Sequence, residues 1–342
     1  MLKWLKRILL ALVALLGVCL VALLIAYFAA AGEYRVPATV AKDTSLPRLT
    51  VKGVTYHGEI HGPKDAPVVI VIHGGPGNDY RYLLPLKPLA DTYRVVFYDQ
   101  RGTGLSPRVP REELTLNNMI EDLANIAKHF GKGQKARLIG HSWGAMLASA
   151  VAGRYPKLFS HIVLAEPGLL TTEAAKAFMK KFRFMPGLKS GLSLIWLWLQ
   201  SRHVKGPDKW AKNDLFFASL TGLDAPENPL KGYACNGDKK TMHIPMWRYG
   251  MDASMEIQGK AMGGKTISIN LVKGIEQYKG KTLFVTGSCN KLIGAPHQKR
   301  YHMKFFPGAT LKVIKDAGHT MFGEKPKVTL KILRDFLKSN PK

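Results

Sequence analysis

Residues 136–155 are ARLIGHSWGAMLASAVAGRY, and three patterns follow one another within this stretch. Ala136–Gly140 is a short apolar run typical of a buried strand, and Ala145–Tyr155 is rich in small residues, as in a closely packed helix. The turn between them, residues 140–144 (GHSWG), is a G-x-S-x-G sequence. Such a turn lifts a serine hydroxyl above a sheet and backs it with a helix N-terminus, which favours negative charge. The pattern therefore predicts Ser142 as a nucleophile.

Strands and helices alternate on both sides of this stretch. Leu49–His61 has the alternation and glycines of a β-hairpin. Leu114–Phe130 and Lys325–Leu337 have helical spacing. Apolar runs typical of buried strands occur at Pro67–His73, Tyr93–Tyr98, His161–Ala165, Lys281–Thr286 and Thr310–Ile314. The alternation predicts an α/β fold, a mostly parallel, doubly wound sheet with helices on both faces.

The stretch from Leu169 to Tyr278 breaks this alternation and is rich in Trp, Met and Lys. We expect an inserted helical cap over the carboxyl end of the sheet, where ligands bind in open α/β folds. Within it, Leu192–Leu199 (LSLIWLWL) predicts a helix that packs on the core, forms an acyl-binding wall, or dips into a membrane. The predicted division is an N-terminal membrane segment at 1–32, a linker at 33–48, a core at 49–168 and 279–342, and a cap at 169–278.

The N-terminus has the pattern of a membrane segment. Residues 1–7 carry Lys3, Lys6 and Arg7 without an acid, and the 24 residues of Ile8–Ala31 are uncharged. About 20 apolar residues span a bilayer, whereas a cleaved signal core has about 7–15. The length favours an uncleaved single-pass anchor, although the alanines ending at Ala31 leave cleavage open. The basic prefix predicts a cytoplasmic N-terminus and a catalytic domain on the outer or periplasmic side.

Composition narrows the possible functions of the 342-residue chain. It has 50 Lys+Arg and 24 Asp+Glu, a formal charge of +26, without a nucleic-acid motif. We therefore expect membrane lipid as a partner of the N-terminal helix and no nucleic acid. Three cysteines are too few for a disulfide scaffold, and no metal or other cofactor is predicted. Outside the cytosol Cys235 and Cys289 are the candidate disulfide pair, although the sequence does not show that they meet.

Two further turns supply groups that a serine nucleophile needs. His319 follows the predicted strand at 310–314 and is the candidate base, because a serine hydroxyl needs a partner that accepts its proton. Residues 73–77 (HGGPG) follow another strand. An oxyanion requires two N–H donors, and we expect them from Gly75 and from Trp143, the residue after the nucleophile.

Together, residues 73–77 (HGGPG), 99–106 (DQRGTGLS) and 140–144 (GHSWG) resemble the α/β-hydrolase superfamily, and most closely its proline iminopeptidase branch. The resemblance covers roughly Leu49–Gly168 and Lys281–Leu337. It implies an α/β-hydrolase fold in which Ser142 and His319 are nucleophile and base, and Gly75 and Trp143 are oxyanion donors. The cap and the N-terminal segment lie outside it.

The acid of the expected triad is irregular. The resemblance implies an Asp after the strand preceding the last one, where this chain has Asn290. A neutral amide orients an imidazole but does not stabilise its charge, and removing the carboxylate of a serine triad costs about 10⁴ in turnover. Glu166, at the end of the strand at 161–165, is the preferred replacement, with Asn290 as the alternative.

Three functions remain open at this stage. The first is a membrane-anchored serine hydrolase that cleaves an amide as an iminopeptidase-like aminopeptidase, through an acyl-enzyme. The second is a carboxylesterase or lipase acting on acyl esters, and the third is a weakened hydrolase that only binds a ligand. Residues 169–277 contain 9 acids and 16 basic residues, which disfavours a substrate with a free amino terminus. The partner is a small-molecule or peptide substrate; the oligomeric state is not predicted.

Overall fold

The computed structural model describes residues 2–182, 186–223, 227–237, 245–262 and 267–339, and is built on an eight-stranded sheet. The strand order is β1-β2-β4-β3-β5-β6-β7-β8. The β1–β2 and β2–β4 pairs are antiparallel and all other pairs are parallel. The predicted mostly parallel sheet is thus confirmed. The strands are β1 (Arg48–Val51), β2 (Val54–His61), β3 (Val68–Ile72), β4 (Arg94–Tyr98), β5 (Ala136–His141), β6 (Phe159–Ala165), β7 (Lys281–Gly287) and β8 (Thr310–Ile314).

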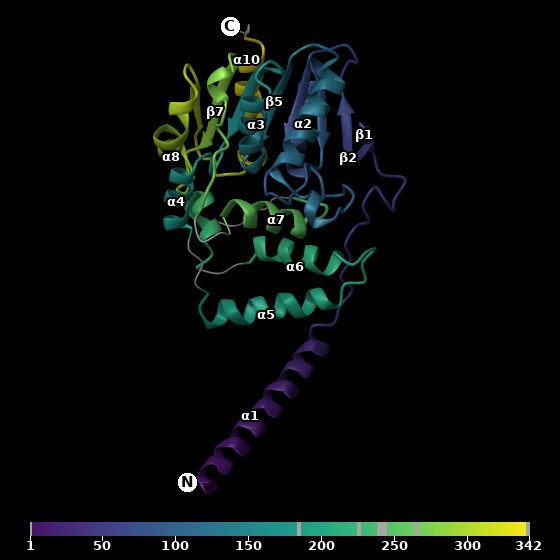
Figure 1. Ribbon diagram of the computed structural model, residues 1–342, viewed down its shortest axis with the longest axis vertical. Helices are drawn as coiled ribbons and strands as arrows, with labels where there is room; N and C mark the ends of the chain where they lie inside the picture. Colours follow the sequence, from purple (N-terminus) through teal and green to yellow (C-terminus); the bar gives the residue numbers. More distant parts are fainter. Residues whose placement is uncertain (1, 183–185, 224–226, 238–244, 263–266, 340–342) are drawn as a thin grey trace.

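Helices cover both faces of the sheet (Figure 1). In β3, Ile70 and Ile72 belong to one apolar core and Val69 and Val71 to the other, because successive side chains of a strand point to opposite faces. The first core includes residues of α2 and α3, and the second includes residues of η1 and α10. A strand buried on both faces is apolar throughout, as the run at 67–73 indicated. The bounds are α2 (Leu116–Gly131), α3 (Trp143–Arg154), η1 (Arg81–Asp91), α8 (Ala295–His297), α9 (Met321–Glu324) and α10 (Pro326–Leu337).

Four helices between β6 and β7 lie together at one end of the sheet (Figure 1). Of these, α7 lies nearest the sheet and α5 is the outermost, with α6 between them. We call this region, residues 169–278, the cap. The boundaries between the N-terminal segment, linker, core and cap stay a prediction. The helices are α4 (Thr172–Lys181), α5 (Leu188–Arg202), α6 (Ala211–Thr221) and α7 (Met251–Met262).

A buried ionic network joins the cap to the core. Asp214 on α6 accepts hydrogen bonds from Arg108, which follows β4, and from Arg248 of the cap, at 2.9 and 2.8 Å. Arg248 also contacts Asp208 at 2.6 Å and the carbonyl of Pro37 at 3.0 Å. Charges removed from water are stable only when paired and hydrogen-bonded. The network therefore fixes the cap and the linker onto the core.

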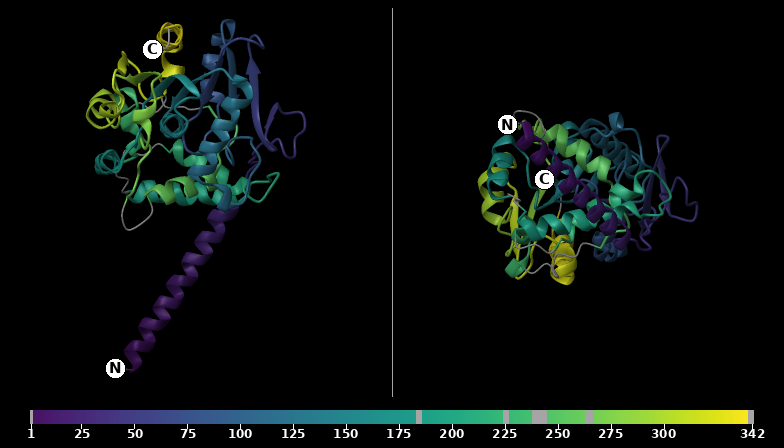
Figure 2. Two further views of the ribbon diagram at one scale, coloured as in Figure 1. Left: turned by 45° about the horizontal axis from the view of Figure 1, so that its top comes forward. Right: turned by 90° about the horizontal axis from the view of Figure 1, so that it is seen from below.

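The N-terminal helix α1 (Leu2–Ala29) projects away from the rest of the chain (Figures 1 and 2). Over Lys3–Ala29 its most apolar window has a mean hydropathy of 3.3 and is exposed. It is the one helix in the described part of the chain that is long and apolar enough to cross a membrane. Such a helix is typical of a membrane anchor or a signal sequence.

Breaking the ionic network is expected to destabilise the protein. Asp214→Ala leaves Arg108 and Arg248 without their shared carboxylate, and loss of one partner of a buried pair costs about 3–5 kcal/mol. We therefore expect a clearly lower melting temperature, measured by circular dichroism in detergent. The control is Asp335→Ala, which removes the exposed Lys331–Asp335 pair; an equal loss in both variants would contradict the role of the network.

Candidate active site

Ser142 lies in a strained turn between β5 and α3. Its backbone angles are φ 54° and ψ −117°, a conformation that residues with a side chain rarely adopt. A Cβ at Gly144 would lie 2.1 Å from the carbonyl oxygen of Ile72, so this position must be glycine for the turn to pack on β3. The turn holds Ser142 at the N-terminal end of α3 and on the wall of a cavity, as predicted.

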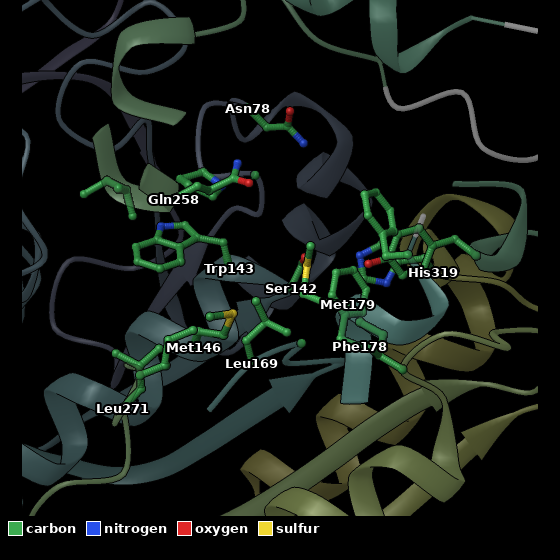
Figure 3. A pocket seen from close by; sticks show the side chains of 18 of the residues that line it. Asn78, Ser142, Trp143, Met146, Leu169, Phe178, Met179, Gln258, Leu271 and His319 are labelled. Carbon is green, nitrogen blue, oxygen red and sulfur yellow. The ribbon is translucent and has the colours of Figure 1, made fainter. Parts of the chain in front are cut away.

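His319 lies on the wall of the same cavity, in the turn after β8 (Figure 3). The ring Nδ1 lies 2.5 Å from Oε2 of Glu166. The backbone N–H of His319 donates to the carbonyl of Tyr233 at 2.8 Å, and the two rings stack with centroids 4.3 Å apart. The imidazole is thus held at one nitrogen and on one face, which leaves Nε2 for other partners.

Glu166 is fully buried at the end of β6. Its carboxylate accepts hydrogen bonds from the backbone of Gly287 at 2.8 Å and from the side-chain amide of Asn290 at 2.6 Å, in addition to His319. Asn290 contacts the carboxylate, and its own oxygen accepts from the backbone of Leu292 and Ile293, both at 3.0 Å. Of the two candidates for the acid, the structure therefore brings Glu166 to the imidazole, whereas Asn290 binds Glu166.

Burial determines the protonation of this pair. It lowers the pKa of His319 to about 3, an effect that the Glu324 carboxylate opposes. Burial also raises the pKa of Glu166, while the hydrogen bonds from Gly287 and Asn290 act in the opposite direction. The imidazole is consequently neutral near pH 7, which is the form that accepts a proton.

Gly75 and Trp143 line the cavity beside Ser142. Gly75 has φ +122°, and a Cβ there would lie 2.5 Å from the backbone nitrogen of Gly77, so the loop requires glycine. The indole of Trp143 donates to Gln100 at 2.9 Å, and Gln100 donates to the carbonyl of His73 at 2.8 Å. Gln100 thus links the side chain of Trp143 to His73, the first residue of the loop that carries Gly75.

The cavity has a volume of about 630 Å³ and lies between the cap and the turns that carry Ser142 and His319 (Figure 3). Its described wall contains apolar residues of the cap, and no Asp, Glu, Lys or Arg. Ligand pockets of this size are commonly apolar with a few polar groups. The apolar residues of the wall include Met146, Leu169, Phe178, Met179 and Leu271.

Four glutamates of the cap, which could bind an amino terminus, lie away from the described wall of the cavity. Glu173 pairs with Lys304 at 2.9 Å, and Glu227 accepts a hydrogen bond from Ser190 at 2.7 Å. Glu276 is exposed. Oε1 of Glu256 lies 3.9 Å from Nε of Arg111. These four residues are absent from the described wall of the cavity, and the described residues contain no cluster of His, Cys, Asp or Glu that would hold a metal ion.

Comparison with known proteins identifies the family of this site. Residues 67–326 match the family model of the alpha/beta hydrolase fold. The chain belongs to the α/β-hydrolase family. A proline iminopeptidase from Pestalotiopsis fici is 24% identical over 295 residues, which cover 84% of this chain and 98% of the relative. A cis-3-alkyl-4-alkyloxetan-2-one decarboxylase from Xanthomonas campestris is 23% identical over 307 residues, covering 86% of this chain and 96% of the relative.

A solved structure of a proline iminopeptidase-related protein from Thermus thermophilus shares the fold. Its TM-score is 0.59 at 20% identity, covering 85% of this chain and 96% of that protein. Other relatives are named as epoxide hydrolases or esterases. The relatives of this α/β-hydrolase thus carry the names of a proline iminopeptidase, a decarboxylase, an epoxide hydrolase and an esterase.

Some features of this α/β-hydrolase site were missed or left open by the sequence. Cys235 in the cap is bonded to Cys289, the residue before Asn290, across 54 positions of sequence. This bond holds the cap segment that carries Tyr233 next to the turn behind Glu166. The presence of two cysteines outside the N-terminal helix was the sequence signal for this bond. No sequence pattern indicated that Tyr233 would stack on His319.

Replacing the carboxylate is expected to separate the two acid candidates. Glu166→Gln keeps the shape of the side chain but removes the charge beside the imidazole, so we expect turnover to fall about 10⁴-fold. Asn290→Ala removes one hydrogen bond to that carboxylate, an effect of about tenfold. Single-turnover and steady-state rates on one ester would measure both. Equal, mild losses in the two variants would rule out Glu166 as the acid.

The burial of His319 predicts an unusual pH profile. The neutral ring is the active form and persists down to its pKa, so lowering that pKa moves the acidic limb of kcat/KM below 6.5, the ordinary histidine value. Rates between pH 4 and 8 would test this, with circular dichroism at each pH to exclude unfolding. A limb at or above pH 6.5 would contradict it.

Proposed function

We propose that this α/β-hydrolase is a membrane-anchored serine hydrolase that cleaves esters of apolar acyl groups through an acyl-enzyme. The observation that carries the proposal is the contact of Glu166 with His319 on the cavity that Ser142 lines. A buried carboxylate that orients an imidazole next to a serine on a strained turn matches the roles of a serine triad.

In the proposed reaction, Oγ of Ser142 attacks the ester carbonyl carbon while its proton passes to Nε2 of His319. Glu166 keeps the ring oriented and stabilises the imidazolium, and the backbone N–H groups of Gly75 and Trp143 bind the oxyanion. The bond between the carbonyl carbon and the alcohol oxygen then breaks, and His319 protonates the leaving alkoxide. Water next donates a proton to His319 as its oxygen attacks the acyl carbon. The bond between the acyl carbon and Oγ of Ser142 then breaks, and His319 returns the proton to Oγ, which releases the carboxylic acid and restores Ser142.

An ester is favoured over a peptide by the charge of the cavity. An aminopeptidase must bind a protonated amino terminus, and a buried cation without a partner is unstable. The described wall offers no carboxylate, whereas its apolar side chains suit an acyl chain. The Glu166 contact also disfavours a weakened, non-catalytic protein, since the partner of the imidazole is a carboxylate and not the neutral Asn290.

An iminopeptidase-like aminopeptidase is the second candidate. The Pestalotiopsis fici relative carries that name and aligns over nearly its whole length. Two cap acids, Asp224 and Asp238, lie outside the described residues. The comparison favours this activity, while the chemistry of the described wall disfavours it.

Anchoring by α1 is supported by its length and exposure. Its basic prefix favours a cytoplasmic N-terminus, and the Cys235–Cys289 bond is typical of an oxidising compartment outside the cytosol. Both observations favour an outer location for the hydrolase domain. A cleaved signal sequence ending near Ala31 is the alternative.

Paired substrates test the activity. We expect the protein to hydrolyse a p-nitrophenyl acyl ester and to leave a proline arylamide intact; hydrolysis of the arylamide alone would favour the aminopeptidase. In Ser142→Ala the nucleophile is absent, so turnover of the ester should fall by about 10⁶-fold. A fluorophosphonate probe should label the native protein and not this variant. An unlabelled native protein would support the binding function instead.

A further inference from the structure

The outermost cap helix, α5, exposes a stripe of large apolar side chains. Leu188, Leu192, Ile195 and Trp196 are 84, 58, 50 and 40% exposed. Their spacing of four, three and one residues places them on one face of the helix. In the described chain beyond α1, this helix carries five of the nine large apolar residues that are exposed, since Trp198 is also 44% exposed. A concentration of this kind marks an interaction surface.

The C-terminal end of α5, the helix that carries this stripe, contacts α1. The ring of His203, directly after α5, donates a hydrogen bond to the carbonyl of Tyr27 at 2.7 Å, and the two rings are 4.3 Å apart. Figure 1 shows α5 lying across the end of the molecule from which α1 departs, and Figure 2 shows the same arrangement from below. If α1 spans a bilayer, α5 is consequently held at the surface of that bilayer.

The charges around α5 complement anionic headgroups. Lys189 is exposed on this helix, Lys205 and Lys209 are exposed in the loop after it, and Lys212 is exposed at the start of α6. The acids of residues 188–215 are Asp208 and Asp214, and both are paired with Arg248 inside the protein. The surface near the stripe is therefore cationic, and basic residues beside an apolar helix face bind anionic lipid surfaces.

The stripe also borders a groove between α5 and α6. Leu188, Leu192 and Trp196 line this groove together with Ser219 and Leu223 at the end of α6. Thr221, between the last two, lines the cavity that contains Ser142. The groove and the cavity therefore meet the same end of α6, although they share no described lining residue.

We propose that the exposed face of α5 lies in the interfacial layer of the bilayer that α1 spans, with anionic lipid as its partner. This inference rests on the proposed anchoring by α1. It adds a second membrane contact, which fixes the orientation of the domain and opens the α5–α6 groove toward the acyl chains. A substrate that partitions into the membrane reaches the cavity from that side.

Fluorescence quenching of the full-length protein in nanodiscs of phosphatidylcholine and phosphatidylglycerol tests the proposal. An NBD label on the native Cys19 reports on α1. In a Cys19→Ala background, labels on Ile195→Cys and on Val328→Cys report on the stripe and on exposed α10 at the opposite end (Figure 1). Ile195 lies outside both the groove and the cavity, so hydrolysis of a short soluble ester checks that each protein is folded.

We expect the label at 195 to be blue-shifted in the nanodisc and quenched by lipids with a nitroxide near the headgroup, and the label at 328 to show neither effect. Because position 19 lies in the middle of α1, lipids with a nitroxide on the acyl chain are used to quench the label there. A quenched label at 19 with equal, unquenched signals at 195 and 328 would overturn the role of α5 while preserving the anchor. An unquenched label at 19 would overturn the anchor and this inference with it.

The charge contribution is measured separately. Changing Lys189, Lys205, Lys209 and Lys212 to Gln should reduce quenching at 195 and leave quenching at 19 unchanged. Changing Lys312, Lys315 and Lys327, which are exposed on β8 and the α10 side, to Gln is the matched control and should have no effect. Equal quenching at 195 in the lysine variant and the native protein would contradict anionic lipid as the partner.

Discussion

The hydrogen bond between Nδ1 of His319 and the buried carboxylate of Glu166 joins the ends of strands that are far apart in the sequence. Glu166 ends β6, His319 follows β8, and β7 lies between them in the sheet. A buried carboxylate is unstable without partners, and here the backbone after β7 and the amide of Asn290 supply them. The site is thus assembled from the carboxyl ends of parallel strands, and its polar groups stabilise the turns that carry them.

The position of the cap depends on two connections to this sheet. One is the ionic network around Asp214, which links α6, the loop after β4 and the linker. The other is the bond between Cys235 and Cys289, next to the residues that contact Glu166 and His319. Since both connections end close to the cavity, the shape of the substrate site and the stability of the cap are physically coupled.

Exposed apolar residues are concentrated at one end of the molecule. The sheet is covered on both faces, whereas α1 and one face of α5 leave apolar residues exposed at the same end. The cavity lies between this end and the sheet. A hydrolase anchored by α1 would therefore present its cap, and not its C-terminal end, to the membrane (Figure 1).

The sequence alone determined the mostly parallel character of the sheet, the succession of strands and helices along the chain, and the turns with Ser142, His319 and Gly75, because these depend on local periodicity and on turn residues. The apolar N-terminal helix was equally evident from its length. The contact of His319 with Glu166 and not Asn290, the joining of Cys235 to Cys289, and the exposure of α5 were decided only by tertiary structure. Each depends on distances between segments far apart in the chain, which strand pairing and cap packing fix and local sequence does not encode.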